Sequence, residues 1–368
     1  MQRMPAGMTS LFLAACLLTG GRAGAAAQVL SWPLSKEMLR HAQLELVWQE
    51  NLAVAEGEQL DTMTVLDDRL YVRSNQNYVW SLDRRNGRLV FDRSIAPAGF
   101  PLLGWTAYDD TLITVIDNQL VELDKNTGSQ RRIMDLELSI VAPPVRNSQY
   151  FYVSAADRRL HVFRADDMVR LFRVAADNNS LITSILADDD LVVLGTDAGN
   201  LIGMMADAAQ KRWQFDAGGP MAGPVVSDGR CYFLASKDTQ VYRVDVTGPT
   251  AATMAWRYQT EAILDREPRA TATVVYQYAV GRGLNAIGKQ SGQALWVLPE
   301  GIELLAEAGG RAYVTTKLKT LAVMDNATGS KLYSVNLAKV TRFAANTLDA
   351  NIYVADEQGR VACLCPAP

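Results

Sequence analysis

The sequence predicts an all-β protein: an eight-bladed β-propeller of four-stranded antiparallel blades, with the ring closed by an N-terminal strand that completes the C-terminal blade. Three observations predict this fold. A unit of apolar segments and tight turns recurs about every 40 residues, a period that is typical of propeller blades. Each copy ends on a bulky, mostly aromatic side chain. The N-terminal region carries the outer strand that the last copy lacks.

The clearest copy of the unit covers residues 67–91. It opens with an Asp-Asp turn, continues through two apolar strands, and ends its third strand on Phe91. An Asn86-Gly87 pair precedes that last strand. Asn-Gly between alternating segments is a strong hairpin signal, because the turn needs positive φ at both central positions. The unit is therefore expected to be a β-meander.

Seven copies of the unit follow from two anchors that share one period. The bulky residue of the last strand recurs at Phe91, Ile133, Phe172, Trp213, Trp256, Trp296 and Tyr333. The second strand recurs around Val72, Thr114, Val153, Val193, Phe233, Val280, Val314 and Val354. We expect the blades at residues 60–95, 102–137, 140–175, 181–217, 221–258, 270–299, 302–337, and 341–365 combined with 44–52.

The two ends of the repeat array complement each other. A last-strand aromatic after Tyr333 would fall beyond Pro368, so the final copy lacks its outer strand. Trp48 lies 43 residues before Phe91, on the same period. We therefore expect the strand around Trp48 to complete the last blade, which also removes an unpaired sheet edge.

Composition excludes some classes of function. The 368 residues are 49% hydrophobic and carry a formal charge of -4. Because clustered Lys and Arg are absent, a nucleic-acid partner is not expected. Four cysteines are too few for a disulfide framework. Cys363 and Cys365 share one strand face with poor geometry for a mutual bridge, whereas a Cys231 to Cys363 bridge stays open.

Residues 1–27 have the pattern of an export signal peptide, with a short apolar core and small residues before Gln28. The apolar core is too short to span a bilayer, so no transmembrane span is expected. A second interpretation is a lipoprotein signal that ends before Cys16, which would then carry a lipid anchor. Residues 28–43 form an N-terminal extension with a short helix capped by Ser35. Residues 44–368 form the propeller.

The recurring turn and terminal aromatic resemble the repeat of pyrroloquinoline quinone (PQQ)-type propellers, as in LDKNTGSQRRI at 123–133 and MDNATGSKLY at 324–333. The resemblance covers nearly all of the exported chain. It implies a propeller fold, but the same repeat builds quinoprotein dehydrogenases and non-catalytic scaffolds such as the outer-membrane assembly propeller lipoprotein. The chain also resembles uncharacterised PQQ-like repeat proteins of planctomycete and verrucomicrobial envelopes.

Departures from the enzyme pattern favour a non-catalytic protein. If the chain were a quinoprotein dehydrogenase, the resemblance implies that it would have adjacent cysteines and often a haem-binding CxxCH. Neither motif is present in the sequence. His41 and His161 are not spaced as zinc ligands. The outer-strand tryptophans are expected to fill the wedges between blades. Asp83, Asp124 and Asp325 are expected to bond backbone N–H groups of their own turns. We therefore predict no catalytic residues, no metal site and no cofactor.

One segment stands out as a candidate interaction loop. The connection at 257–270 is expected to be the longest between blades and combines charged with apolar residues. Loops on a rigid scaffold commonly carry function. The residues assigned to the loop are Ile263, Leu264, Asp265, Arg266, Glu267 and Arg269.

The sequence thus predicts an exported, non-enzymatic scaffold that binds a protein partner in the periplasm or at the outer membrane of a bacterial envelope. Two alternatives stay open. One is a quinone- or metal-dependent oxidoreductase without the usual signatures. The other is a sensor or carbohydrate-binding propeller that uses the channel.

Overall fold

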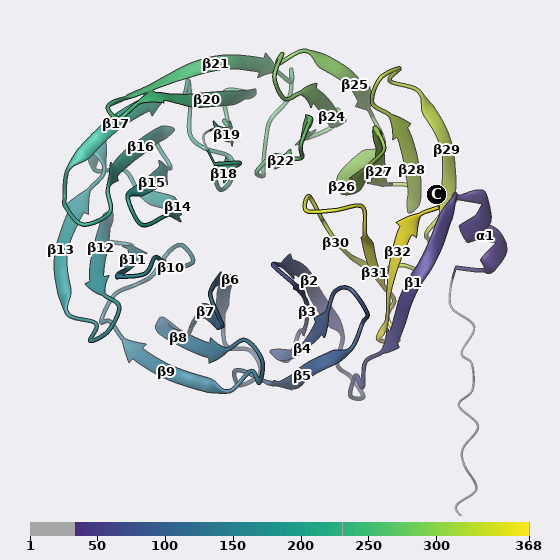
Figure 1. Ribbon diagram of the computed structural model, residues 1–368, viewed down its shortest axis with the longest axis horizontal. Coiled ribbons are helices and arrows are strands. Elements are labelled where there is room, and N and C mark those ends of the chain that lie inside the picture. The colour runs from purple at the N-terminus through teal and green to yellow at the C-terminus, as the bar shows by residue number, and fades with distance from the viewer. Residues whose placement is uncertain (1–33, 230, 368) are drawn as a thin grey trace, which may run out of the picture. The chain divides into compact units, whose positions relative to one another are not determined.

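A computed structural model of the chain describes residues 34–229 and 231–367. The propeller is built from eight antiparallel four-stranded sheets arranged in a ring, as Figure 1 shows. In each sheet the strands follow one another from the centre of the ring to the rim. The prediction of an eight-bladed propeller is confirmed. The expected signal segment and Cys16 lie outside the described residues.

The elements are grouped here by blade. Blade 1 has β2 Leu60–Leu66, β3 Arg69–Ser74, β4 Tyr78–Asp83 and β5 Leu89–Ser94; blade 2 has β6 Leu102–Tyr108, β7 Thr111–Ile116, β8 Gln119–Asp124 and β9 Gln130–Asp135; blade 3 has β10 Val145–Arg146, β11 Tyr150–Ala155, β12 Arg159–Arg164 and β13 Arg170–Ala175; blade 4 has β14 Ile182–Ala187, β15 Leu191–Thr196, β16 Asn200–Met205 and β17 Lys211–Asp216. Blade 5 has β18 Val226–Ser227, β19 Cys231–Ala235, β20 Gln240–Gly248 and β21 Ala251–Gln259; blade 6 has β22 Arg269–Ala270, β23 Val274–Ala279, β24 Gly283–Gly288 and β25 Ala294–Leu298; blade 7 has β26 Gly301–Ala308, β27 Arg311–Thr316, β28 Thr320–Asp325 and β29 Lys331–Asn336; blade 8 has β30 Arg342–Ala344, β31 Ile352–Ala355, β32 Arg360–Pro366 and β1 Leu44–Asn51. The short helices are α1 Lys36–His41 and η1 Asp177–Asn179.

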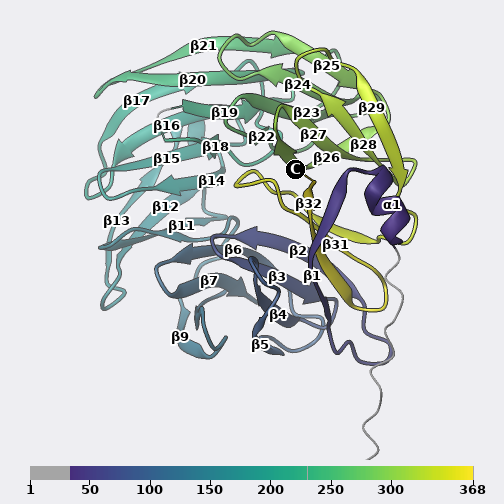
Figure 2. The ribbon, with the colours of Figure 1, turned by 45° about the vertical axis from the view of Figure 1, so that its right-hand side comes forward.

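The ring closes as the sequence predicts. Strand β1 pairs antiparallel with β32 along its whole length, with Trp48 opposite Cys363. Figure 2 shows these two strands side by side, with α1 at the rim beside them. Ser35 caps α1, because its hydroxyl accepts a hydrogen bond of 3.1 Å from the backbone N–H of Met38. The chain ends therefore share one blade.

Every outer strand carries a β-bulge one residue before the aromatic position. In blade 1 the pairing skips Val90, so that Phe91 lies opposite Ser81. The same register identifies Arg132, opposite Glu122, as the equivalent residue in blade 2. The sequence assignment of Ile133 to this position was therefore wrong by one residue, and Ile133 is 44% exposed. Val280 was also misassigned, because β23 ends at Ala279.

The outer-strand aromatics close the seams between blades, as expected. The indole N–H of Trp48 donates to the carbonyl of Arg84 in the next blade at 3.0 Å. The turn must come close to the ring, because a Cβ on Gly87 would lie 2.6 Å from Trp48. Gly87 therefore serves both the positive φ of the turn and this approach. Equivalent contacts join Phe91 to Gly128 and Trp256 to Gly292.

Three of these seams also have an ion pair of their own, and all of these pairs lie on the same face of the ring. In each, a cation from the turn between the third and fourth strands reaches an aspartate between the first two strands of the preceding blade. The pairs are Lys125 with Asp67 and Asp68, Arg84 with Asp349, and Lys289 with Asp228. Sequence repetition thus places both an apolar wedge and a charge pair at these joints.

The seam between blades 2 and 3 is closed by charge instead of an aromatic ring. Arg132 donates to the carbonyl of Ala165 at 3.0 Å, in the turn where other seams receive an indole N–H. Its Nε also donates to Glu122 at 2.7 Å. Arg146 approaches the same carboxylate at 3.4 Å and lies 4.9 Å from the centre of the Phe151 ring. This seam therefore depends on a largely buried carboxylate held between two cations.

The seam between blades 7 and 8 is completed by the N-terminal extension. The last blade has a break between its third and fourth strands, where other blades have a turn. The hydroxyl of Tyr333 donates instead to the carbonyl of Ala42, directly after α1, at 2.7 Å. The N–H of Ala367 donates to the carbonyl of Gln43 at 2.8 Å. The two chain termini together replace the missing turn.

Candidate functional site

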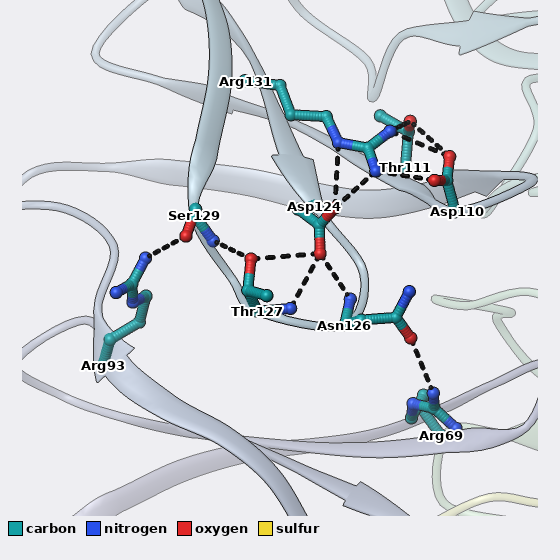
Figure 3. A network of polar contacts seen from close by, with 9 residues as sticks. All are labelled: Arg69, Arg93, Asp110, Thr111, Asp124, Asn126, Thr127, Ser129 and Arg131. Carbon is teal, nitrogen blue, oxygen red and sulfur yellow. Dashed lines mark hydrogen bonds and ion pairs between the residues drawn. The ribbon is translucent and has the colours of Figure 1, made fainter.

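The turn aspartates have the structural role that was predicted for them. Asp124 accepts backbone N–H bonds from Asn126 and Thr127 at 2.9 and 2.8 Å, as Figure 3 shows. Asp83 and Asp325 accept equivalent bonds. The side chain of Arg131 bonds Asp124 and, together with these turn bonds, holds the pKa of its carboxyl at about 2. The network fixes a turn at a blade seam.

The histidines and cysteines that the sequence singled out lie apart. His161 is buried in β12, and its Nε2 contacts the carboxylate of Asp157 at 3.0 Å. Cys231, Cys363 and Cys365 are free thiols. Cys231 belongs to blade 5 and Cys363 to blade 8, so the bridge between them is excluded. Among residues 34–229 and 231–367, no group of three or more His, Cys, Asp or Glu side chains is placed to hold a metal ion.

The candidate interaction loop is the entry into the inner strand of blade 6 and is not unusually long. The connections 136–144, 217–225 and 260–268 each separate two strands by nine residues. In blades 3 and 5 the inner strand first forms an isolated bridge, at Ile140 and Met221, before its regular pairing. Blade 6 repeats this arrangement, because Val280 donates its N–H to the carbonyl of Ile263 at 2.9 Å. The expectation that this connection departs from the repeat was wrong.

Several residues of the candidate loop hold blade 6 in the ring. Leu264 is fully buried in the apolar cluster between blades 5 and 6, so it cannot contact a partner. Arg269 forms ion pairs with Glu267 at 2.8 Å and with Glu303 of blade 7 at 3.2 Å. Burial acts to lower the pKa of Arg269, but these two carboxylates outweigh it and raise the pKa. Arg269 is therefore a joint between blades.

The remaining residues of the loop are more accessible. Arg266 pairs with Asp265 at 3.0 Å and lies 4.3 Å above the centre of the Tyr278 ring. Glu267 faces Arg269. Ile263 is 62% exposed. Of the two apolar residues predicted for the loop, Ile263 is exposed to solvent and Leu264 is buried.

Ile263 belongs to a larger exposed surface on the same face of the ring. Because successive strands run antiparallel, the inter-blade connections and the turns between second and third strands lie on one face, which we call the loop face. Val280, in the second-to-third turn of blade 6, is 45% exposed. Leu318, in the same turn of blade 7, is 67% exposed. Leu318 and Ile263 are the two most exposed large apolar side chains of the described propeller.

Basic side chains lie in the turns that carry Val280 and Leu318 and in the connection beside Leu318. Lys317 and Lys319 flank Leu318, and the N–H of Leu337 bonds the carbonyl of Lys319 at 2.8 Å, which brings the connection carrying Lys339 alongside. Arg282 lies in the turn with Val280. We define the blade 6–7 loop patch as Ile263, Val280, Leu318, Arg282, Lys317, Lys319 and Lys339.

Sequence reasoning missed most of this patch because its residues come from four separate segments. Leu318 in Thr-Lys-Leu-Lys-Thr reads as one more apolar residue of a strand-rich repeat. A signal was present, since Lys317 and Lys319 place charges on both sides of an isolated leucine between two strands. Only the ring topology places that turn on the same face as Ile263, one blade away.

Comparisons with known proteins agree with this architecture. A family model described as outer membrane protein assembly factor BamB matches residues 94–216 and, in an overlapping second match, 173–299. Together these matches span more than half of the chain. The chain belongs to this family of PQQ-like repeat β-propellers. Curated proteins include no match to the chain.

Three solved structures with the same architecture are a bacterial protein, a designed protein and a WD40 domain. BamB from Moraxella catarrhalis is 15% identical, with a TM-score of 0.66 over 88% of this chain and 97% of that one. The computationally designed Ika8 protein is 14% identical, with a TM-score of 0.64 over 87% and 99%. The C-terminal WD40 domain of Sif2 is 10% identical, with a TM-score of 0.63 over 88% and 98%. These likenesses show that the PQQ-like repeats fold as a propeller.

None of the helices in residues 34–229 and 231–367 is long and apolar enough to cross a membrane.

Proposed function

We propose that this protein is a non-enzymatic, exported interaction scaffold of a bacterial cell envelope, and that it contacts a protein partner through the blade 6–7 loop patch. One observation carries the proposal: the two most exposed large apolar side chains, Leu318 and Ile263, lie on adjacent blades of one face. Exposed apolar residues that gather on a rigid surface commonly mark interaction sites.

The comparisons support the scaffold role. The family model bears the description of an outer membrane protein assembly factor, and BamB of Moraxella catarrhalis has the same fold. An assembly role in the envelope is consistent with the export signal expected in residues 1–27. N-terminal analysis of the mature protein tests this point, because soluble export predicts a chain that starts at Gln28, whereas a lipoprotein would start at a lipidated Cys16.

A capture experiment tests the role of the patch. The wild-type protein and the variant I263D/L318D are immobilised and incubated with envelope extract from cells that make the protein. Because both side chains are exposed, the variant should keep its thermal stability while losing most of the captured partner. Leu348, 59% exposed in the turn between the first two strands of blade 8, lies on the opposite face and provides the control L348D.

The result of this comparison decides the proposal. Equal capture by all three proteins would exclude the patch as the interaction surface. A separate assay addresses the enzyme alternative: the protein is incubated with PQQ and calcium, and reduction of an artificial electron acceptor by alcohols and sugars is measured. We expect no turnover, and stoichiometric PQQ binding with turnover would overturn the scaffold role.

A further inference from the structure

The charges of the blade 6–7 loop patch are unevenly compensated. The side chain of Arg282 is paired with Glu261 at 2.6 Å. Glu300, next to Lys317 in the fold, directs its carboxylate to Lys331 at 2.9 Å. Lys317, Lys319 and Lys339 have no ion-pair partner within 4.0 Å among residues 34–229 and 231–367. The patch therefore presents positive charge around Leu318.

The neighbouring sectors of the loop face have the opposite character. The second-to-third turn of blade 8 exposes Glu357, and the connection that follows this blade contains Glu56 and Glu58, whereas Asp356 is buried and paired with Arg360. The loops of blades 2 to 4 add several aspartates and Glu137. In a chain with a formal charge of -4, three lysines without an ion pair, on blade 7 and the connection that follows it, are a local reversal of sign, although Glu300 lies near enough to Lys317 to feel its charge. This reversal coincides with the largest apolar exposure on the face.

We propose that the blade 6–7 loop patch binds an extended segment of a partner protein in which acidic residues flank apolar ones. This inference rests on the proposed scaffold function and adds the chemistry of the partner. Leu318, Ile263 and Val280 form the apolar contact, and Lys317, Lys319 and Lys339 bind the carboxylates beside it. Complementary charge around an apolar centre sets the orientation and the specificity of such a contact.

The arrangement also opposes a segment of the wrong charge. A basic segment would place its cations against three lysines that form no ion pair within the described residues, and like-charge contacts suppress wrong partners. An acidic segment that slid toward blade 8 would meet the exposed carboxylate of Glu357. The acidic neighbour therefore confines the partner to blades 6 and 7.

Three fluorescent 12-residue peptides test the proposal with the full-length mature protein. The peptides share the same leucines and differ only in carrying Glu, Gln or Lys between them. Binding is measured by fluorescence anisotropy in 50 mM and 300 mM salt. We expect the acidic peptide to bind at least ten times more tightly than the basic one, and this preference to shrink at the higher salt.

Matched variants locate the binding site. The charge reversal K317E/K319E/K339E should remove or invert the preference, and L318D should weaken binding of the acidic peptide about tenfold. K237E reverses a lysine in the equivalent turn of blade 5 and should leave binding unchanged, as should L348D on the opposite face.

Two outcomes would overturn the proposal. The first is equal affinity for the acidic and basic peptides, or no binding of the acidic peptide at millimolar concentration. The second is lysine-dependent binding to phosphatidylglycerol vesicles without peptide binding, which would assign the patch to a membrane surface. If I263D/L318D still loses its envelope partner in either case, the scaffold function stands and only the acidic chemistry of the partner is wrong.

Discussion

Replacing Trp48 with alanine should weaken the joint at which the ring closes. Trp48 is 7% exposed and packs between Gly87 of blade 1 and the ring of Tyr353, whose centre is 6.0 Å away. Its indole N–H also donates to the carbonyl of Arg84. The substitution therefore removes a buried aromatic side chain and one hydrogen bond at the place where the two chain ends meet.

The magnitude follows from these contacts. Truncating a buried tryptophan to alanine costs about 3–5 kcal/mol through lost burial and the remaining cavity. W48F should cost less, about 1–2 kcal/mol, since a ring remains in the wedge. The carbonyl of Arg84 also keeps the hydroxyl of Tyr353 at 3.3 Å. For a body of roughly 330 residues, an unfolding entropy near 0.7 kcal/mol/K makes 4 kcal/mol equal to about 6 °C in Tm.

Calorimetry and hydrogen exchange measure the effect. W256A is the matched control, because Trp256 closes the seam between blades 5 and 6 with the same bond to a turn carbonyl. Both variants should lose similar stability, but W48A alone should accelerate amide exchange in β1, which only pairing with β32 holds in the sheet. A W48A protein with unchanged Tm and a protected β1 would refute this account of closure.

Three further predictions concern charged and titratable groups. Because the folded pKa of Asp124 is about 2 and its unfolded value about 3.9, its carboxylate stabilises the fold above pH 4 and this contribution disappears as the pH falls through 2; the Tm difference between wild type and D124N should shrink over that range, and a constant difference would contradict it. E122Q leaves Arg132 and Arg146 without their shared anion and should lower the free energy of unfolding in urea by about 2–4 kcal/mol, somewhat less than the usual cost of about 3–5 kcal/mol because the Arg132 side chain is 30% exposed; no loss would show that charge does not close this seam. Burial raises the pKa of Cys363 to about 12, so maleimide should label Cys231 and Cys365 first in the folded protein, as read by mass spectrometry of peptides, and equal labelling of all three would contradict the burial of Cys363.

The fold could be predicted because its determinants repeat. The glycine turn before the outer strand, an Asp in three of these turns and the outer-strand aromatic recur at one period, and the same period assigns Trp48 to the last blade. A feature that appears eight times tolerates individual exceptions. Ser35 was predictable for a different reason, since a hydroxyl before a short amphipathic segment has one common role.

The blades that depart from the repeat pattern could not be predicted, because contacts between residues distant in sequence stabilise them. Arg132 takes the place of an aromatic residue only because Glu122 and the carbonyl of Ala165 accept its hydrogen bonds. The inner strands of blades 3, 5 and 6 pair over two residues, too few to give an alternating pattern. The segment before β22 therefore looked like a free loop, although Leu264 within it is fully buried.

The candidate site was predicted only in part, because most of its residues come together through contacts between segments distant in sequence. Ile263 was identified from its local sequence and is exposed. The other apolar residues of the patch come from a different turn of blade 6 (Val280) and from blade 7 (Leu318), and a period of about 40 residues predicts their blades but not their exposure. Charge was equally hidden, since the ion pairs of Glu261 with Arg282 and of Glu300 with Lys331 join residues that are distant in sequence.

Position-resolved photo-crosslinking in living cells tests the central claim most directly. A photo-reactive amino acid is placed singly at Ile263, Leu318 or Leu348, three side chains of similar exposure. The account predicts that illumination joins the same envelope protein to positions 263 and 318 and leaves position 348 without that product. Crosslinking to one protein from position 348 alone, or equally from all three, would contradict an interaction surface on the loop face of blades 6 and 7.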